Sequence, residues 1–305
     1  MAFDRTVTTI IDQEKCEFCG ECIKVCPSDT ISVVNKKAVI TGDQSLVCDH
    51  CRAACKSDAI SVGGIDDSLS KFSSFKSEKK WLPFGQYDTT NLVNLMQSRR
   101  SCRNYKNRPV EKELLEDLIK IGITAPSGSN CQMWTFTVLP DRKSVEALGE
   151  KLKGFFQNLN RLAKKTWLRG LLRLFGKSQL SNYYENYYES IKEGLEEWEA
   201  KDKDILFHGA PAAIIIACKR EASCPAEDAL LAAQNILLGA HSIGLGTCLI
   251  GFAVSAMSNE RKICDFIDLP DDENVHAVIT VGYPNDTYIN VTGRKPVSIR
   301  YFTAI

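Results

Sequence analysis

"CEFCGECIKVCPSDTI", residues 16–31, holds four cysteines in the spacing C-x2-C-x2-C-x3-C, followed directly by Pro27. Three cysteines within seven residues let the backbone fold around one corner of an iron–sulfur cubane, and the proline then forces the chain out of that turn. Structural zinc is the alternative, but zinc usually takes its ligands as two separated pairs. The spacing therefore predicts an iron–sulfur module in this part of the chain.

A second stretch, "SLVCDHCRAACKSDAI" at residues 45–60, aligns with the first without a gap. It keeps three of the cysteine positions, but Ser45 stands where the first copy has Cys16, and Lys56 stands where it has Pro27. Between the cysteine runs, residues 30–41 alternate well enough to predict a hairpin with Asn35-Lys36-Lys37 as its turn. The two copies together resemble bacterial dicluster ferredoxins.

In dicluster ferredoxins the fourth cysteine of each run binds the other cluster. The resemblance therefore implies one complete ligand set: Cys16, Cys19, Cys22 and Cys55. The second set would be Cys26, Cys48 and Cys51, with Ser45 in the fourth place. A serine alkoxide is a harder and less acidic ligand than a thiolate, so this corner is altered. Three outcomes stay open: a four-iron cluster completed by Ser45, Asp43 or solvent, a three-iron cluster, or an empty site. The three retained cysteines favour an occupied but altered site.

Composition excludes several classes of protein. Lys plus Arg and Asp plus Glu both number 38 among 305 residues, and this balance argues against nucleic acid as the main partner. We expect neither a signal peptide nor a transmembrane helix, because no apolar stretch approaches about 18 residues. Seven of the thirteen cysteines crowd between Cys16 and Cys55, which indicates metal ligation rather than a disulfide framework. We expect a cytoplasmic protein that makes no membrane contact.

Residues 1–63 form the expected iron–sulfur domain, and residues 64–90, rich in Ser, Lys and Gly, read as a linker. Residues 91–305 have the character of a mixed domain of helices and strands. Amphipathic residues 110–123 and the apolar run 226–245 predict helices. Three β-branched, apolar runs predict buried strands at 134–139, 212–219 and 276–283.

A polar, aromatic and strongly charged stretch at about 144–204 is expected to be a helical insertion, because no strand pattern interrupts it. Its basic first part and acidic second part are suited to pair as a helical hairpin. We interpret it as a lid over a pocket or a brace in a dimer, in preference to a membrane-contacting segment.

Four short signals in the second domain indicate a bound phosphate and a planar ligand. In "SRRSCRNY", residues 98–105, Arg99, Ser101 and Arg103 share one face of an extended segment. Two guanidiniums and a hydroxyl suit a phosphate and a polyhydroxyl chain, and Arg294 and Lys295 near the C-terminus add two more cations. The alternative for these residues is a solvated basic surface.

The stretch "APSGSNCQMWTF", residues 125–136, has small residues that allow a planar ligand to approach the backbone. Asn130 and Gln132 can satisfy ring carbonyls and N–H groups, and the alternative is an ordinary helix-to-strand loop. "GLGTCLIGF", residues 244–252, is not a dinucleotide fingerprint, because Leu249 occupies the third glycine position and a helix precedes the motif.

In this order, RRS-x-R-x-Y, APS-x-x-N-x-Q-x-W, GLGTC-x-IG, GYP and RKP resemble the nitroreductase family from about residue 91 to the C-terminus, apart from the insertion. With the cysteine module in front, the whole chain resembles ferredoxin-fused nitroreductases. The resemblance implies an α+β fold, with a mostly antiparallel sheet flanked by helices, preceded by a small ferredoxin-like domain. It also implies a homodimer with FMN in its interface. Met133 and Phe252 depart from the family pattern.

The resemblance also implies roles for single residues. The FMN ribityl-phosphate would be held by Arg99, Ser101, Arg103, Arg294 and Lys295. Pro126, Ser127 and Gly128 would reach the flavin from the partner subunit, with Asn130 and Gln132 near the same interface. Leu249, Ile250 and Gly251 would lie alongside the isoalloxazine. No side chain is expected to act as a catalytic acid or base, since the flavin carries the chemistry and water supplies the protons.

Iron–sulfur clusters pass single electrons, whereas FMN stores two and releases them as a pair. The combination predicts an oxidoreductase that takes electrons from a low-potential donor, reduced ferredoxin or NAD(P)H. They would pass through 4Fe-4S clusters to FMN and then to a small organic acceptor such as a nitroaromatic or a quinone. The alternatives are an enzyme that reduces activated alkenes and an electron-transfer relay whose partner is another redox protein.

Overall fold

The cysteine repeat folds into a small module built from two pairs of antiparallel strands, in a computed structural model that describes residues 4–201 and 203–304. Strand β1 (Thr9–Ile11) pairs with β4 (Ile60–Val62), and β2 (Ile31–Val34) pairs with β3 (Lys37–Ile40). The short helices α1 (Glu21–Lys24) and α2 (His50–Ala53) carry Cys22 and Cys51 into the core of the module. The repeat in the sequence is therefore a repeat in the structure.

The hairpin turn between β2 and β3 is one residue shorter than predicted. Asn35 and Lys36 both have positive φ, as a two-residue type I′ turn requires, and Lys37 already pairs with Val34 in the ladder. The sequence alone could not separate Lys36 from Lys37, because two identical residues at the turn give no signal for which of them leaves it.

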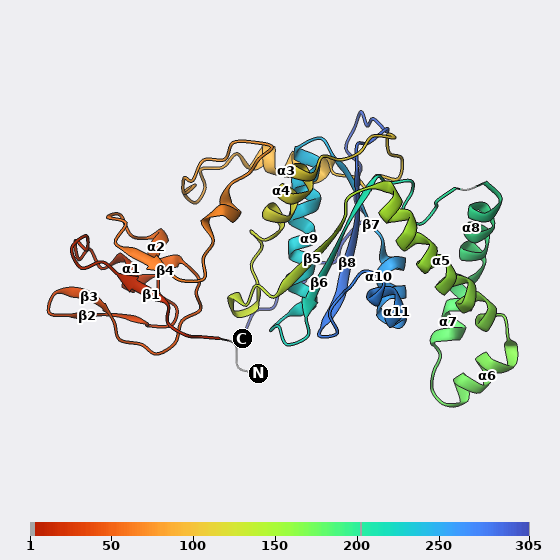
Figure 1. The fold of residues 1–305 in the computed structure, drawn as a ribbon, viewed down its shortest axis with the longest axis horizontal. Helices are drawn as coiled ribbons and strands as arrows, with labels where there is room; N and C mark the ends of the chain where they lie inside the picture. The colour runs from red at the N-terminus through yellow and green to blue at the C-terminus, as the bar shows by residue number, and fades with distance from the viewer. Residues whose placement is uncertain (1–3, 202, 305) are drawn as a thin grey trace.

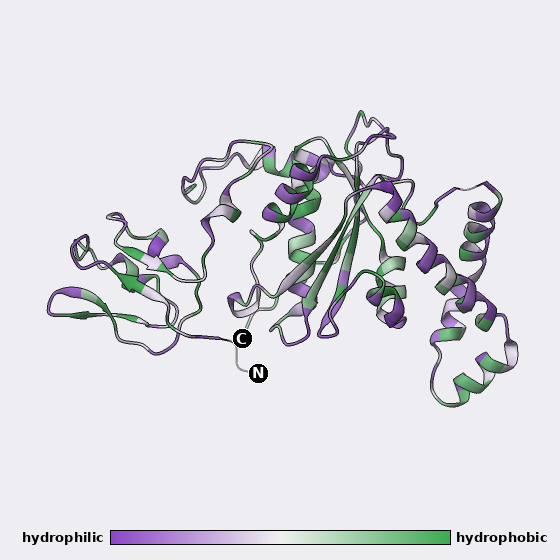
Figure 2. Cartoon of the chain, viewed as in Figure 1, coloured by the Kyte–Doolittle hydropathy of each residue, from purple (hydrophilic) through white to green (hydrophobic). Residues whose placement is uncertain are grey.

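The second domain is organised around a four-stranded antiparallel sheet with the order β5-β6-β8-β7 (Figure 1). Its strands are β5 (Trp134–Leu139), β6 (Ala212–Lys219), β7 (Gly246–Leu249) and β8 (Glu273–Gly282). Strands β6 and β8 are central, which explains their continuous apolar sequences, since helices cover both faces of the sheet. Figure 2 shows the same contrast between an apolar sheet and polar connections. The expected antiparallel α+β fold is confirmed.

Alternate residues of β6 bury into two separate cores, one on each face of the sheet. Ile215 packs with helices α5, α10 and α11, while Ile214 and Ile216 pack with helices α4 and α9. Helix α3 (Thr89–Ser98) precedes this domain's helices, which are α4 (Lys112–Gly122), α9 (Pro225–Ser242), α10 (Gly251–Asn259) and α11 (Arg261–Asp265). Within the described part of the chain, no helix combines the length and apolar character needed to cross a membrane.

The insertion consists of four helices, which project from the sheet domain on the side away from the cysteine module (Figure 1). They are α5 (Arg142–Ala163), α6 (Thr166–Leu174), α7 (Gln179–Asn186) and α8 (Tyr188–Lys201). The guanidinium of Arg169 lies 3.5 Å from the ring centroid of Tyr184, and the Tyr184 and Tyr188 rings stack 4.8 Å apart. The two parts therefore pack together as predicted, and the contact between Arg169 and Tyr184 is one of cation and aromatic ring.

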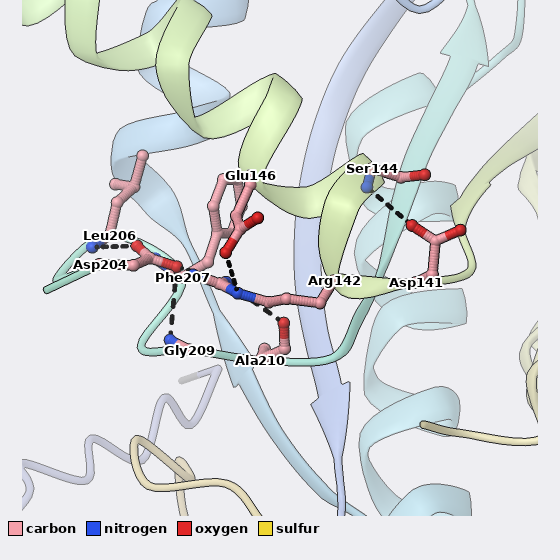
Figure 3. A network of polar contacts seen from close by, with 9 residues as sticks. All are labelled: Asp141, Arg142, Ser144, Glu146, Asp204, Leu206, Phe207, Gly209 and Ala210. Carbon is pink, nitrogen blue, oxygen red and sulfur yellow. Dashed lines mark hydrogen bonds and ion pairs between the residues drawn. The ribbon is translucent and has the colours of Figure 1, made fainter. Parts of the chain in front are cut away.

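An ion pair closes the insertion at its base (Figure 3). Arg142, the first residue of α5, places Nη1 2.7 Å from Oδ2 of Asp204, just beyond the end of α8. The buried carboxylate also accepts backbone N–H bonds from Leu206, Phe207 and Gly209. The insertion therefore leaves and rejoins the sheet domain at one place.

The segment expected as a linker, residues 64–90, is fixed to the sheet domain near its start. After the 3₁₀ helix η1 (Asp67–Ser70), the carboxylate of Asp117 in α4 accepts bonds from the Ser73 N–H, the Ser74 N–H and the Ser74 hydroxyl at 2.7–2.8 Å. Asp117 has no exposed surface, and Lys120 donates to the carbonyl of Lys71. The cysteine module is therefore tethered closely to α4.

Candidate flavin and iron–sulfur sites

Cys16, Cys22, Cys51 and Cys55 belong to the core of the module, and Cys26, Cys48 and Cys51 line one cavity. Burial raises the pKa of Cys22, and the charges of Cys16, Cys19 and Cys55 raise it further. Burial raises the pKa of Cys51 to about 11, with Cys48 and Cys26 adding to the effect. Crowded, buried thiols resist ionisation unless a cation compensates them, and the iron of a cluster supplies that charge.

Matching N–H···S bonds support the fourth cysteine of each run. The Thr30 N–H donates to Cys26 Sγ at 3.4 Å, and the Ala59 N–H donates to Cys55 Sγ at 3.3 Å. Burial acts to raise the pKa of Cys26, but N–H bonds from Ser28 and Thr30 outweigh it and hold this pKa below its usual value. Among residues 4–201 and 203–304, no three His, Cys, Asp or Glu side chains are arranged to hold a single metal ion. A set of thiols with N–H···S bonds suits an iron–sulfur cluster.

Ser45 lies with the incomplete group. It lines one small cavity together with Cys26, Cys48 and Cys51, and only 9% of its surface is exposed. Its Oγ accepts the Val47 N–H at 3.0 Å, so the hydroxyl already has a partner in the structure. Ser45 is therefore close to the incomplete group, and its role as a fourth ligand stays a prediction.

Three arginines form a cationic cradle where the phosphate is expected. Burial lowers the pKa of Arg99, and the neighbouring charges of Arg100 and Arg294 lower it further. Segment 99–103 is held against β7 by a Ser101–Thr247 bridge and by a bond from the Cys102 N–H to the Thr247 carbonyl. Guanidiniums that cluster in this way suit an anion. Lys295 follows Arg294 in the exposed C-terminal segment, which forms neither helix nor strand.

A pocket of about 790 Å³ includes Arg103, from the same segment as Arg99, among its lining residues; Arg99, Arg100 and Arg294 do not line it. Its floor contains Arg103, His208 and the run Cys248–Gly251, which includes the three residues expected beside the isoalloxazine. Its wall comes from the insertion and α10: Phe156, Leu159, Gln179, Asn182, Tyr183, Tyr187 and Phe252. The Phe252 ring meets Phe156 and Tyr187 edge-on, with centroids 5.8 and 6.0 Å apart. The insertion is thus a wall of the pocket, as the lid interpretation predicts.

Sequence reasoning did not identify the residues of this wall or the role of His208. Aromatic residues in a charged helical stretch give no signal for which of them face a pocket. His208 lies beside Arg103, and burial, followed by the Arg103 charge, lowers the pKa of His208 against the opposing effect of Asp204. Its imidazole is therefore neutral at neutral pH and offers hydrogen bonds without adding charge.

The loop 126–132 is fixed in place by a buried aspartate on α9. Asp228, 1% exposed, accepts the Gly128 N–H at 2.8 Å and lies 3.4 Å from Cys131 Sγ. The Gln132 N–H donates to Ser127 Oγ, and Gln132 Nε2 donates to Asn130 Oδ1. The Asn130 amide faces the cysteine module, where it bonds to the carbonyls of Leu46 and Val47. The expected partner of this amide was a flavin carbonyl.

The structure does not bring this loop together with Leu249–Gly251 in one chain. Strands β5 and β7 are the two edges of the sheet, three strand spacings or roughly 14 Å apart. Across the sheet, Leu249 pairs with Ile279, Ile279 with Ile214, and Ile214 with Val138, so Leu249 lies at the height of Val138. The loop precedes Trp134, at the opposite end of β5. One planar ligand cannot touch both segments of the same chain.

Comparison with known proteins agrees with this arrangement. Residues 96–283 match the model of the nitroreductase family, and residues 9–32 match the model of the 4Fe-4S binding domain. The chain belongs to the nitroreductase family. It is therefore a flavin-dependent oxidoreductase, and it carries an iron–sulfur segment in front of its nitroreductase domain.

Relatives of this nitroreductase family member include an iodotyrosine deiodinase from Thermotoga neapolitana, 27% identical over 215 residues, which are 70% of this chain and 98% of the relative. Another iodotyrosine deiodinase, from Haliscomenobacter hydrossis, is 30% identical over 86 residues, 27% of this chain and 38% of the relative. A crystal structure of a nitroreductase with bound FMN from Bacteroides fragilis is similar in fold. Its TM-score is 0.51 at 20% identity, covering 71% of this chain and all of that one.

Proposed function

We propose that this protein uses FMN and 4Fe-4S clusters to reduce a small aromatic acceptor, such as a nitroaromatic or a quinone. The electrons come from a low-potential donor, reduced ferredoxin or NAD(P)H. The observation that carries the proposal is the aromatic-walled pocket that contains Arg103 and the run Cys248–Gly251. When bound, clusters exchange electrons singly, and a flavin delivers them to an acceptor in pairs.

The chain's own residues have three tasks in this proposal. Arg99, Ser101, Arg103, Arg294 and Lys295 bind the phosphate and ribityl chain. Leu249, Ile250 and Gly251 line the pocket and would hold the ring system of the flavin. The helices of the insertion exclude water and orient the acceptor. Solvent supplies the two protons that a quinone takes up with two electrons, since the lining residues include no acid–base pair.

The working form is a homodimer. The loop 126–132 and Leu249–Gly251 lie at opposite edges and opposite ends of the sheet, so both reach one flavin only if two copies of the chain contribute. Pro126, Ser127, Gly128, Asn130 and Gln132 would then approach the flavin of the partner subunit. Size-exclusion chromatography with light scattering tests this, and a flavin-loaded monomer would contradict it.

The aromatic wall favours planar acceptors. Tyr183, Tyr187, Phe156 and Phe252 present ring faces and edges, and stacked aromatic pairs add about 0.5–1.5 kcal/mol each beyond burial. Among the described residues that line the pocket, the basic side chains are Arg103 and His208, and there is no aspartate or glutamate. Neutral and anionic aromatic molecules therefore fit better than cations.

Reductive deiodination of iodotyrosine is a second candidate, because the Thermotoga relative matches over almost its whole length. The pocket disfavours it, because an amino-acid ammonium group is best balanced by a carboxylate, and the described lining contains none. Two alternative functions, electron relay to another redox protein and reduction of activated alkenes, are distinguished by the stopped-flow experiment described next.

The test is anaerobic purification, identification of the flavin, and stopped-flow reoxidation of dithionite-reduced protein. We expect FMN and iron, with rapid reoxidation by nitroaromatics or quinones and slow reoxidation by 3-iodotyrosine and enoates. Reoxidation by a protein acceptor alone would establish the relay. A preparation without flavin would overturn the proposal.

A variant of the wall tests the acceptor site. Tyr187→Ala, at a half-exposed residue, is expected to raise the KM for an aromatic acceptor about tenfold by removing a ring worth about 1.4 kcal/mol. Trp167→Ala is the matched control, because Trp167 is an exposed aromatic residue of the same insertion outside the pocket lining. Equal KM values in the two variants would show that the aromatic wall does not contact the acceptor.

A further inference from the structure

The cysteine module and the loop 126–132 are joined by a single side chain. Asn130 Nδ2 donates to the Leu46 carbonyl at 3.0 Å and to the Val47 carbonyl at 3.1 Å. These two carbonyls lie between Ser45 and Cys48, the serine and the first cysteine of the altered group. The Val47 carbonyl belongs to the peptide bond that joins Val47 to Cys48. The hydrogen bond from Asn130 therefore ends directly beside an expected cluster ligand.

Both sides of this contact have unusual backbone conformations. Val47 has φ +50°, a left-handed conformation that a β-branched residue rarely adopts, and Asp49 has φ +60°. On the other side, Ser129, Asn130 and Gln132 have φ of +53°, +54° and +47°. Such conformations persist only when the surroundings fix them, and they concentrate at functional sites. Asparagine tolerates the left-handed region, which suits it to this position.

Further bonds hold each side in position before they meet. Ser45 Oγ accepts the Val47 N–H, and the Ser45 N–H donates to the Arg5 carbonyl at 2.8 Å. Gln132 Nε2 donates to Asn130 Oδ1 at 3.1 Å, which orients the amide so that its N–H groups face the module. The contact is therefore the meeting point of two prearranged loops.

We propose that Asn130 is a positioning residue that fixes the Ser45–Cys48 loop, and with it the altered cysteine group, against the loop 126–132 of the flavin domain. This inference rests on the proposed function, because it assigns electron entry to the altered group rather than to Cys16, Cys19, Cys22 and Cys55. Each acceptor molecule consumes two electrons, which the low-potential donor supplies one at a time. No bond is made or broken at Asn130 itself.

Two variants of Asn130 separate its hydrogen bonds from its backbone conformation. Asn130→Asp keeps the size and the tolerance for positive φ but removes both N–H donors and places a carboxylate against two carbonyls. Asn130→Gly keeps only the backbone freedom. Asn35→Asp is the matched control, since Asn35 is also left-handed, at φ +51°, but lies in the β2–β3 turn.

The first readout is amide hydrogen exchange in the full-length protein. We expect exchange at Ser45 and Val47 to become about tenfold faster in both Asn130 variants and to stay unchanged in Asn35→Asp. The second readout is the rate at which electrons redistribute to the flavin after partial dithionite reduction. This rate, compared between samples matched for measured iron and flavin content, should fall about tenfold in both Asn130 variants and stay unchanged in Asn35→Asp.

Unaltered exchange at Ser45 and Val47 in both Asn130 variants would overturn the positioning role. Faster exchange with an unaltered electron-transfer rate would overturn the assignment of electron entry to the altered group. Failure of the proposed function is distinguishable from both results, because protein without iron or flavin still reports its hydrogen exchange.

Discussion

The two halves of the cysteine module have diverged in opposite directions. The first group, Cys16, Cys19, Cys22 and Cys55, is complete and reaches solvent at the exposed Cys19. The second group has exchanged one cysteine for the buried Ser45, and its loop contacts the flavin domain through Asn130. The complete group thus has a solvent-exposed thiol, whereas the loop of the incomplete group contacts the flavin domain. The group with a serine in place of its fourth cysteine is therefore also the group whose loop contacts the flavin domain.

The largest effect is expected from removing one cysteine of each group in turn. Cys22→Ala should remove about four iron atoms per chain and Cys51→Ala three or four, with partial unfolding of the module, because both side chains lie in its core and cluster binding contributes to its folding. Iron and sulfide analysis with circular dichroism measures this. If Cys51→Ala leaves the iron content unchanged, the second group is empty and the comparison fails.

The loop 126–132, which carries Asn130, is held in place by Asp228. Asp228→Asn replaces a buried acceptor of the Gly128 N–H with a side chain whose NH₂ group lacks a matched partner, and should lower the free energy of unfolding by about 2–3 kcal/mol. Urea unfolding measures it. Glu227→Gln, at the exposed neighbouring position, is the control and should change it by less than about 0.5 kcal/mol. Equal effects would show that burial of Asp228 is unimportant.

The tether of the whole module should respond to pH. Burial acts to raise the pKa of Asp117, but bonds from Ser74, Lys120 and Ser73 outweigh it and lower the pKa from its ordinary 3.8. A lowered pKa stabilises the fold above pH 3.8, and this contribution is lost as the pH falls through the folded value. Asp117→Asn should therefore cost about 1–2 kcal/mol at pH 7 and progressively less below pH 3.8, in urea titrations at each pH. A gap that persists at low pH would refute the carboxylate's role.

The smallest change is expected from restoring the missing thiol. Ser45→Cys weakens one bond to the Val47 N–H, worth about 1 kcal/mol, but completes the second group. Iron should rise by about one atom per chain if the native centre has three irons, and the EPR spectrum should change in any case where Ser45 borders an occupied site. Identical spectra and iron content would show that the serine does not alter an occupied centre.

Local patterns in the sequence predicted the architecture well. The gapless cysteine repeat, the apolar runs of β5, β6 and β8 and the amphipathic α4 each report their surroundings directly, because burial on one or two faces sets the residue pattern. The signals failed where a role depends on a distant partner. Nothing near Asn130 in the sequence indicates Leu46 or Val47, and nothing near Asp117 indicates Ser73, since these contacts span 83, 84 and 44 positions of the chain.

The ion pair of Arg142 and Asp204 has a consequence for how such a protein can diversify. Since the polypeptide departs from and returns to the scaffold at one clasp, the intervening helices can lengthen, shrink or be exchanged while the strands keep their register. The helices that line the pocket can therefore vary in sequence without a change in the sheet or in the cysteine module on the other side of the sheet domain.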